Sequence, residues 1–352
     1  MRTIVVSAVN VRKGGTLSIL KSCLRYLSNR ASEPDSGLHV IALVHKKALC
    51  SFPGIEYMEI PWSIKSWARR LWCEYVTMWR ISKRLADETG EPVDVWLSLH
   101  DTTPRVLAKT REVYCQTSFP FMKRNLRDLW MDPKIYLFAL FTRFAYRINI
   151  HKNDSIIVQQ NWFRDAMSEM LNVPKEKFRV ITPDISAATV SPSSDIKSEL
   201  PTFFYASTAD CHKNFETLFE AARLLEDKIG RGKFKVCATI SGKENRYSRW
   251  LSKRWGDVSS IEFAGFLSLE ELYGRYRQAA CFVFPSRIET WGLPMTEFMS
   301  VSERPMILAD LPYAHETFLS GKGADKREVR FFPATDASAL AGIMETFVTT
   351  EK

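Results

Sequence analysis

The chain has 352 residues, of which 45% are hydrophobic and 25% are charged, and its formal net charge is +9. This composition is that of a folded globular protein and excludes a disordered or fibrous chain. The length exceeds what one hydrophobic core usually serves, so we expect two α/β domains of roughly 150 to 200 residues. The positive charge indicates an anionic partner, such as a lipid surface, a phosphorylated substrate or nucleic acid.

Seven cysteines are scattered singly, without a Cys-x-x-Cys pair, and no secretory leader precedes the first apolar run. This pattern favours a reducing cytoplasm and argues against a zinc site. Charges interrupt every apolar stretch well before the roughly 18 to 20 residues that a membrane-spanning helix needs. We therefore expect no transmembrane segment, while contact with a membrane surface stays compatible with the charge.

In the first half of the chain, short apolar runs alternate with longer helical stretches. A strand at residues 3–9 leads through Arg12, Lys13, Gly14 and Gly15 into a helical pattern at residues 17–27. Further strands are expected at residues 39–44, 93–99, 112–116 and 155–159. This alternation predicts a parallel sheet covered by helices.

The second half repeats the pattern after a segment rich in Ser, Ala, Thr, Pro and Asp, which we interpret as an interdomain linker. The sequence predicts a first domain at 1–183, the linker at 184–201, a second domain at 202–335 and a final helix at 336–352 that packs back towards the first domain. Within the second domain we expect strands at 202–206, 234–240, 260–264, 281–284 and 305–309, helices at 214–225 and 295–301, and a capping box of Ser268 and Glu271. Both halves then form Rossmann-like, doubly wound domains, which bind ligands at the carboxyl ends of their strands.

The clearest motif runs from Pro285 to Glu297, between two predicted strands. Gly292 lets the backbone approach a ligand closely, and Pro294 suits the first turn of the helix that follows. The free amides of that turn attract a phosphate or sugar oxygen. Glu289 and Glu297 can accept hydrogen bonds from hydroxyl groups on different parts of one extended ligand. Sugars and riboses offer such hydroxyls.

This segment resembles the Glu-x7-Glu motif of the family-4 glycosyltransferases, whose GT-B fold consists of two Rossmann-like domains facing across a cleft. The resemblance extends over essentially the whole chain. It implies that Glu289 contacts the transferred sugar, that Glu297 contacts the ribose, and that the amides of Gly292 and Leu293 hold the donor. It also implies an acceptor role for the first domain and a donor role for the second.

The same resemblance assigns roles to two further loops. Gly14 and Gly15 correspond to a glycine loop that faces the donor phosphates, and Lys13 adds positive charge on the acceptor side. Lys213 corresponds to the second member of a basic pair that holds the donor diphosphate. Ser207 or Thr208 stands where the family has the first member, an Arg, so that half of the pair is missing or comes from elsewhere, such as Lys243.

Four residues at or just after the ends of other strands complete the expected site. His100 and Asp101 resemble a His-acidic step in which the histidine contacts the donor sugar or the reacting centre. Gln116 is placed on the acceptor side. Glu316 resembles a residue in a loop near the nucleotide base, and a helix cap is the alternative reading of it.

Two stretches of the first domain, at residues 62–85 and 119–147, combine many aromatic residues with Lys and Arg. This combination favours the interface of an anionic membrane, and solvated amphipathic helices are the alternative. Nucleic acid is disfavoured because no nucleic-acid-binding motif accompanies the charge.

The sequence therefore predicts a retaining, metal-independent glycosyltransferase without a cofactor. It would move a hexose or deoxyhexose from a nucleoside diphosphate sugar to a lipid-linked glycan at the inner face of the membrane, in the synthesis of lipopolysaccharide or another surface polysaccharide. A nucleotide-sugar epimerase of the same fold and a non-catalytic nucleotide-sugar-binding protein of the membrane surface are the alternatives. A dinucleotide dehydrogenase is disfavoured because the first strand lacks a Gly-x-Gly-x-x-Gly turn.

Overall fold

The computed structural model describes residues 2–123, 125–183 and 199–349. The chain divides into two compact units. The first comprises residues 1–120 and 141–184, and the second comprises residues 121–140 and 185–352. Most of the linker expected at 184–201 lies outside the described residues.

The first unit contains a seven-stranded sheet in the order β3-β2-β1-β4-β5-β6-β7, and all neighbouring strands are parallel. Its strands are β1 (Arg2–Ala8), β2 (Leu38–Val44), β3 (Ile55–Glu59), β4 (Val93–Ser98), β5 (Ala108–Tyr114), β6 (Ser155–Val158) and β7 (Phe178–Val180). Its helices are α1 (Gly14–Ala31), α2 (Trp67–Trp72), α3 (Met78–Thr89) and α6 (Asn161–Leu171), with a π-helical turn at Cys73–Thr77 between α2 and α3. Helix α5 (Pro133–Arg147) begins in the second unit and ends in the first.

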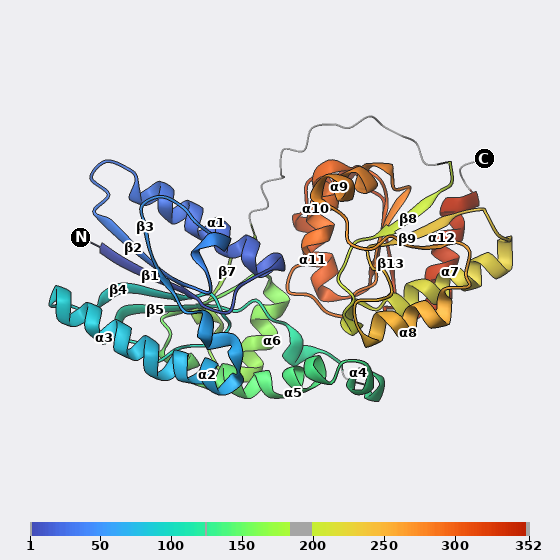
Figure 1. Ribbon diagram of the computed structural model, residues 1–352. Coiled ribbons are helices and arrows are strands. Elements are labelled where there is room, and N and C mark those ends of the chain that lie inside the picture. Colours follow the sequence, from blue (N-terminus) through green and yellow to red (C-terminus); the bar gives the residue numbers. More distant parts are fainter. Residues whose placement is uncertain (1, 124, 184–198, 350–352) are drawn as a thin grey trace. The chain divides into compact units, whose positions relative to one another are not determined.

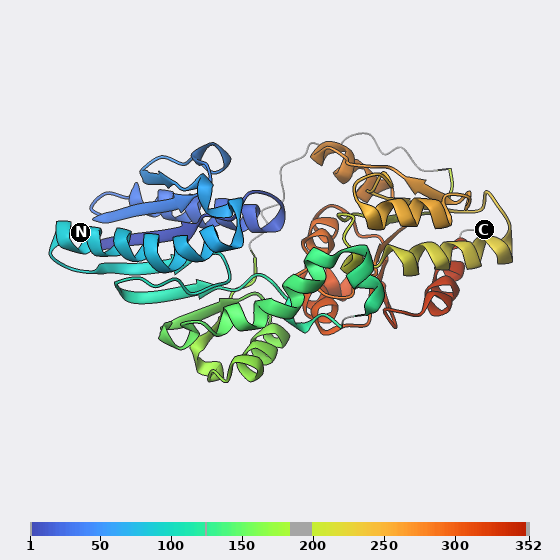
Figure 2. The same cartoon turned by 60° about the horizontal axis from the view of Figure 1, so that its bottom comes forward.

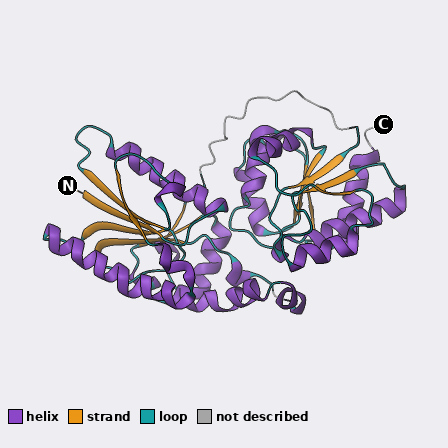
Figure 3. Cartoon of the chain, in the orientation of Figure 1, coloured by secondary structure: helices purple, strands orange, loops and turns teal. Residues whose placement is uncertain are grey.

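The second unit contains a six-stranded parallel sheet in the order β10-β9-β8-β11-β12-β13. Its strands are β8 (Thr202–Tyr205), β9 (Lys235–Ala238), β10 (Ile261–Phe263), β11 (Cys281–Phe284), β12 (Met306–Ala309) and β13 (Val329–Phe332). Its helices are α4 (Leu126–Met131), α7 (Phe215–Ile229), α8 (Arg246–Trp255), α9 (Leu269–Gln278), α10 (Leu293–Val301), α11 (Pro312–Ser320) and α12 (Ala337–Thr349). Helices flank each sheet (Figures 1 and 3), so two Rossmann-like units confirm the predicted fold class.

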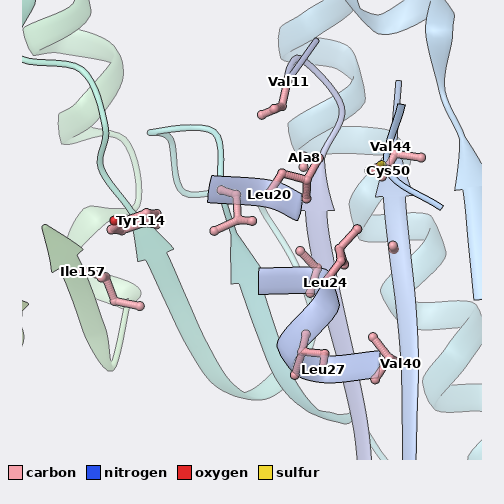
Figure 4. Packing of buried hydrophobic residues seen from close by; sticks show 13 residues of the cluster. Ala8, Val11, Leu20, Leu24, Leu27, Val40, Val44, Cys50, Tyr114 and Ile157 are labelled. Carbon is pink, nitrogen blue, oxygen red and sulfur yellow. The ribbon is translucent and has the colours of Figure 1, made fainter. Parts of the chain in front are cut away.

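Apolar spacing explains how the first helix packs. Leu20, Leu24 and Leu27 recur along one side of α1, and all three are buried. They form one buried cluster with apolar side chains of the sheet, in which Leu27 is drawn beside Val40 and Leu20 beside Ala8 (Figure 4). This packing fixes the amino end of α1 just beyond the carboxyl end of β1, which is where the glycine loop lies.

Both sheets reverse their strand order at the centre, and this reversal places the candidate site. The order changes direction between β1 and β4 in the first unit and between β8 and β11 in the second. In open parallel sheets, ligands bind outside the carboxyl ends of the strands at such a switch point. The loops that follow these four strands carry His100, Lys213 and Glu289 as well as the glycine loop.

One feature of the domain organisation differs from the sequence expectation. Residues 121–140, expected within the first domain at 1–183, belong to the second unit. Helix α4 lies beside α8 (Figure 2), because Arg246 of α8 stacks over the Trp130 ring of α4. The final helix α12 packs against α7 inside the second unit, and its expected packing towards the first domain stays a prediction.

Candidate functional site

Two loops of the second unit form the centre of the candidate site. One follows β8 and ends at Asn214, and the other follows β11 and ends at Gly292. The amide of Arg287 donates to the carbonyl of His212 at 2.8 Å, and the Asn214 side chain donates to the carbonyl of Pro285 at 2.9 Å. These hydrogen bonds join the two loops into one rigid edge of the sheet.

The edge brings Lys213 and Glu289 together. The Lys213 ammonium lies 2.5 Å from Oε1 of Glu289, and the Ser286 hydroxyl donates to the same oxygen at 2.7 Å. Both side chains are 14% exposed. A positive and a negative group therefore share a partly enclosed position, where each can exchange its partner for a ligand phosphate or hydroxyl.

Gly292 begins the turn into α10 and needs to be glycine on two grounds. Its φ of +88° lies in the region that side-chain-bearing residues rarely adopt. A Cβ atom there would also come within 3.2 Å of the Met295 sulfur. Leu293 and Pro294 then open α10, whose first turn contains no acidic residue. Pro294 has no amide proton and the Met295 amide donates to the Gly292 carbonyl at 2.9 Å, so the Leu293 amide and the helix dipole are what this end offers to an anion. Donor binding at this position stays a prediction.

Glu297 lies in the second turn of α10, away from Glu289. Its carboxylate accepts a hydrogen bond from the Tyr276 hydroxyl at 3.5 Å, so its partner is a neutral group and not a cation. Burial raises the pKa of Glu297 above the ordinary value. The partly buried carboxylate therefore gains from any further hydroxyl donor that a ligand brings.

Ser207 and Thr208, which stand where the family has an arginine, form hydrogen bonds with nearby side chains of the second unit. The Thr208 hydroxyl donates to Asp210 at 2.6 Å, and the Ser207 amide donates to the Thr239 hydroxyl at 2.8 Å. Lys243 is exposed on the loop after β9, the strand next to β8. The role of Lys243 at a diphosphate stays a prediction.

The glycine loop of the first unit lies at the amino end of α1. Gly14 has a φ of +67°, and α1 begins there without a side-chain cap. Lys13 is the N-cap residue and is exposed. The free helix amides and Lys13 thus form a second position suited to an anion.

His100 is enclosed in a buried polar network. The Trp96 indole donates to the Ser7 hydroxyl, whose own proton is then available to Nε2 of His100 at 3.1 Å. Nδ1 of His100 lies 3.1 Å from the Thr102 hydroxyl, which donates to Glu74 at 2.7 Å. The His100 side chain is 0% exposed. Burial, and then the charge of Arg70, lower the pKa of His100 well below its ordinary value, so the ring is neutral.

Asp101 and Gln116 contact each other at the carboxyl ends of neighbouring strands. Asp101 has a φ of +71°, which is uncommon for a residue with a side chain. Its carboxylate accepts hydrogen bonds from the Gln116 amide at 2.5 Å and from the Thr117 hydroxyl at 2.8 Å. Burial raises the pKa of Asp101. Such backbone strain is frequent at functional sites.

The structure thus brings some predicted residues together and separates others. Lys213, Glu289 and Gly292 share one edge of the second unit, and Gly14, His100 and Asp101 lie at the switch-point edge of the first. Glu316 lies inside α11, past the capping position. The roles of these residues towards a ligand stay predictions.

The sequence reasoning missed three residues that support Glu289 and Glu297, namely Ser286, Arg287 and Tyr276. Ser286 was visible in the motif, three residues before Glu289, but its hydrogen bond to that carboxylate depends on the turn. Tyr276 belongs to the preceding helix, and nothing in its sequence position indicates Glu297.

The described residues offer neither a metal-binding cluster nor a membrane-spanning helix. Residues 2–123, 125–183 and 199–349 contain no group of three or more His, Cys, Asp or Glu arranged to hold a metal ion. In this same part of the chain, no helix combines the length and the apolar character needed to cross a membrane.

The fold and the site define a class, the GT-B glycosyltransferase fold. Sucrose-phosphate synthase from Thermosynechococcus elongatus matches 99% of this chain and 90% of its own, with a TM-score of 0.64 and 16% identity. HepE from Anabaena, in complex with UDP-glucose, matches 100% of this chain and 91% of its own, with a TM-score of 0.64 and 12% identity. At these identities the likeness establishes the fold.

The sequence comparisons add a family model and two relatives. Residues 201–349, which are less than half of the chain, match the family model of the glycosyl transferases group 1. The O-antigen chain mannosyltransferase RfbU of Salmonella typhimurium is 24% identical over 241 residues, which are 64% of this chain and 63% of RfbU. The serotype-specific mannosyltransferase WbdA of Escherichia coli is 33% identical over 141 residues, which are 38% of this chain and 17% of WbdA. The matches thus span less than two thirds of the length of either relative.

Proposed function

We propose that the protein is a retaining glycosyltransferase that moves a hexose or deoxyhexose from a nucleoside diphosphate sugar to a glycan of a surface polysaccharide. The observation that carries the proposal is the contact of Lys213 with Glu289, 2.5 Å apart beside the open amino end of α10. The group 1 match of the second domain supports transfer. Mannose is the favoured sugar, because RfbU and WbdA are mannosyltransferases.

The proposed donor replaces the internal partners of this edge. Lys213 turns from Glu289 to the diphosphate, and the Leu293 amide at the start of α10 donates a hydrogen bond to a phosphate or sugar oxygen. Glu289 is then free to accept hydrogen bonds from the sugar hydroxyls, and Glu297 from the ribose. Catalysis is mainly electrostatic, because the departing diphosphate gains negative charge that Lys213 and the Leu293 amide stabilise.

Retention of configuration follows if the acceptor hydroxyl attacks from the side of the departing diphosphate. The diphosphate itself then takes the proton of the attacking hydroxyl, so the reaction needs neither a side-chain base nor a metal ion. The acceptor is proposed to be lipid-linked and to approach from the first domain, near Lys13, Asp101 and Gln116.

We further propose that the protein works in the cytoplasm at the inner face of an anionic membrane. The support is a set of exposed apolar side chains that we call the α5 stripe: Leu137, Phe141 and Phe144 on α5, and Ile148 directly after it. Exposed Lys134, Arg143 and Arg147 accompany the stripe, and α5 contains no Asp or Glu. Trp67 and Trp72 of α2 are exposed as well. Bases beside exposed aromatics suit an anionic lipid surface.

Replacing Glu289 by Ala tests the proposed reaction. The variant should keep its fold and lose transfer by at least about a hundredfold, because an interaction specific to the reacting sugar is removed. Transfer is measured with GDP-mannose, UDP-glucose and a dTDP-hexose on lipid-linked glycan acceptors, after a thermal-shift screen selects the donor that binds. Full activity of the variant contradicts the proposal, and an isomerised donor formed without acceptor indicates an epimerase.

A further inference from the structure

A short segment from the first half of the sequence is part of the donor-domain unit. Residues 121–140 belong to the second unit, although the remainder of residues 1–183 forms the first. We call residues 121–140 the strap. Its helix α4 has one face against the unit and another exposed, since Asp128 and Met131 are buried while Leu126 and Trp130 are exposed.

Two ion pairs hold the strap to different parts of the unit. Arg127 pairs with Glu216 on α7, and Glu216 also accepts a hydrogen bond from the Tyr247 hydroxyl. Asp128 pairs with Arg287 at 2.8 Å. The first pair thus reaches a helix, and the second reaches the loop that carries Glu289.

The Asp128–Arg287 pair is the more enclosed of the two. Side-chain exposure is 1% for Asp128 and 12% for Arg287, against 39% for Arg127. Burial by itself lowers the pKa of Arg287, but the hydrogen bond and charge of Asp128 outweigh burial and raise it. A buried guanidinium without this carboxylate would be strongly unfavourable, so Asp128 is what allows an arginine at this position.

Arg287 joins the two loops of the candidate site by its side chain as well as its backbone. The guanidinium donates to the Cys211 carbonyl at 2.9 Å, and the amide of Arg287 donates to the His212 carbonyl at 2.8 Å. Lys213 directly follows His212 on the loop after β8. Glu289 lies two residues after Arg287 on the loop after β11. The position of Arg287 therefore sets the distance between Lys213 and Glu289.

We infer that Asp128 is a positioning residue of the donor site: through Arg287, it holds the loops after β8 and β11 in the register that places Lys213 beside Glu289. The inference rests on the proposed function for its catalytic consequence only. Asp128 touches no substrate and acts through Arg287 alone. The strap precedes the linker in the sequence, and it thereby positions loops of the second unit that are proposed to bind the donor.

Hydrogen exchange of the unliganded protein tests the positioning directly. In Asp128→Ala the amide of Arg287 should exchange about tenfold faster or more, the effect of losing a charge-assisted hydrogen bond to the loop. Arg127→Ala is the matched control, because it removes the other ion pair of the strap and leaves Arg287 paired. Equal exchange at Arg287 in the two variants overturns the inference.

Kinetics separate positioning from stability. The double variant Asp128→Leu with Arg287→Met replaces the buried pair by apolar side chains, which commonly restores stability. If the pair positions the loops, the double variant regains its melting temperature, while kcat with GDP-mannose stays reduced roughly ten- to hundredfold, as expected for a misplaced site. Recovery of kcat together with stability overturns the inference. If Asp128→Ala does not fold, the double variant and the control decide.

The two proposals fail in distinguishable ways. A wild-type protein that binds none of GDP-mannose, UDP-glucose and a dTDP-hexose contradicts the proposed function, and the exchange rates of the unliganded variants still decide the inference. Conversely, normal transfer by wild type with identical Arg287 exchange in Asp128→Ala and Arg127→Ala overturns the inference and leaves the proposed function standing.

Discussion

Individual residues of this protein show which site properties a sequence can reveal. The anion-binding turn was predictable because Gly292 and Pro294 have conformational preferences that belong to the residue itself. The contact of Lys213 with Glu289 was not, since 76 positions separate them in the chain. Their proximity follows from the pairing of β8 with β11, which brings the ends of two distant strands together.

His100 is a residue whose position could be predicted from the sequence, whereas its surroundings could not. Its place at the end of a strand was predicted, yet its environment depends on Ser7 of β1, on Trp96 of the preceding strand β4 and on Thr102 of the following turn. A histidine with both ring nitrogens engaged is a stable core residue, and any contact with a ligand would require this network to rearrange. Neighbours of this kind leave no signal in the spacing around His100.

Glu297 gives a prediction at the scale of a single residue. Because its pKa is raised in the folded protein, the folded state binds the proton more tightly than the unfolded state. The group therefore contributes stability below its ordinary pKa of 4.5, and this contribution is lost as the pH rises through the folded value. Glu297→Gln should thus melt at a higher temperature than wild type at pH 7, with a difference that shrinks towards pH 4.5.

The same substitution should weaken donor binding by about tenfold, the effect of losing a charged hydrogen-bond acceptor for a hydroxyl. Calorimetric titration with the selected nucleotide sugar measures this loss, and melting curves from pH 4 to pH 8 measure the stability. A variant that is less stable than wild type at pH 7 would contradict the assigned environment of Glu297.

At the scale of elements, the sequence predicted the strands near the centre of each sheet better than the edges. Strands β8 and β11 are nearly continuous apolar runs, because both faces are covered by helices. The edge strands β3 and β7 are short or polar and were not predicted. The capping box of Ser268 and Glu271 was confirmed, because its two hydrogen bonds are local to the helix start.

The α5 stripe leads to a prediction for one helix. Phe141→Ser with Phe144→Ser should reduce binding to vesicles of phosphatidylglycerol by about tenfold or more, because two large apolar side chains no longer enter the lipid. Leu269→Ser with Leu319→Ser is the control, since both leucines are exposed but lie outside the stripe. Cosedimentation with anionic and with zwitterionic vesicles measures the effect. Equal losses in the two variants would remove α5 from the membrane proposal.

At the scale of the whole molecule, two parallel-sheet domains could be predicted from the alternation of strands and helices. It could not be predicted from the sequence that residues 121–140 belong to the second unit. That membership depends on side chains such as Asp128 and Arg287, which are 159 positions apart and meet only in the folded protein. Composition changes little across the strap, so no boundary signal marks it.

If the chain is cut at the linker, the second domain loses the strap and is incomplete. A fragment that starts at residue 199 should be less stable than the same domain in the full chain, because Glu216 and Arg287 lose their partners and apolar surface is exposed. Adding a peptide of residues 121–140 should raise its melting temperature, by roughly 2 to 4 °C for each kcal/mol of binding. A fragment whose melting does not respond to the peptide would contradict this assignment.

The crossing of α5 from one unit to the other has a consequence for exchange of domains between related enzymes. Hybrid enzymes are commonly joined at a single boundary, so that each parent supplies one contiguous half. Here the chain passes between the units after residue 120, again after residue 140 and once more after residue 184. A recombination joint near residue 200 would pair a strap from one parent with an Arg287 loop from the other. The chain therefore contributes four segments to the two units, two to each, and a grafted second unit must include its own residues 121–140 as well as residues 185–352.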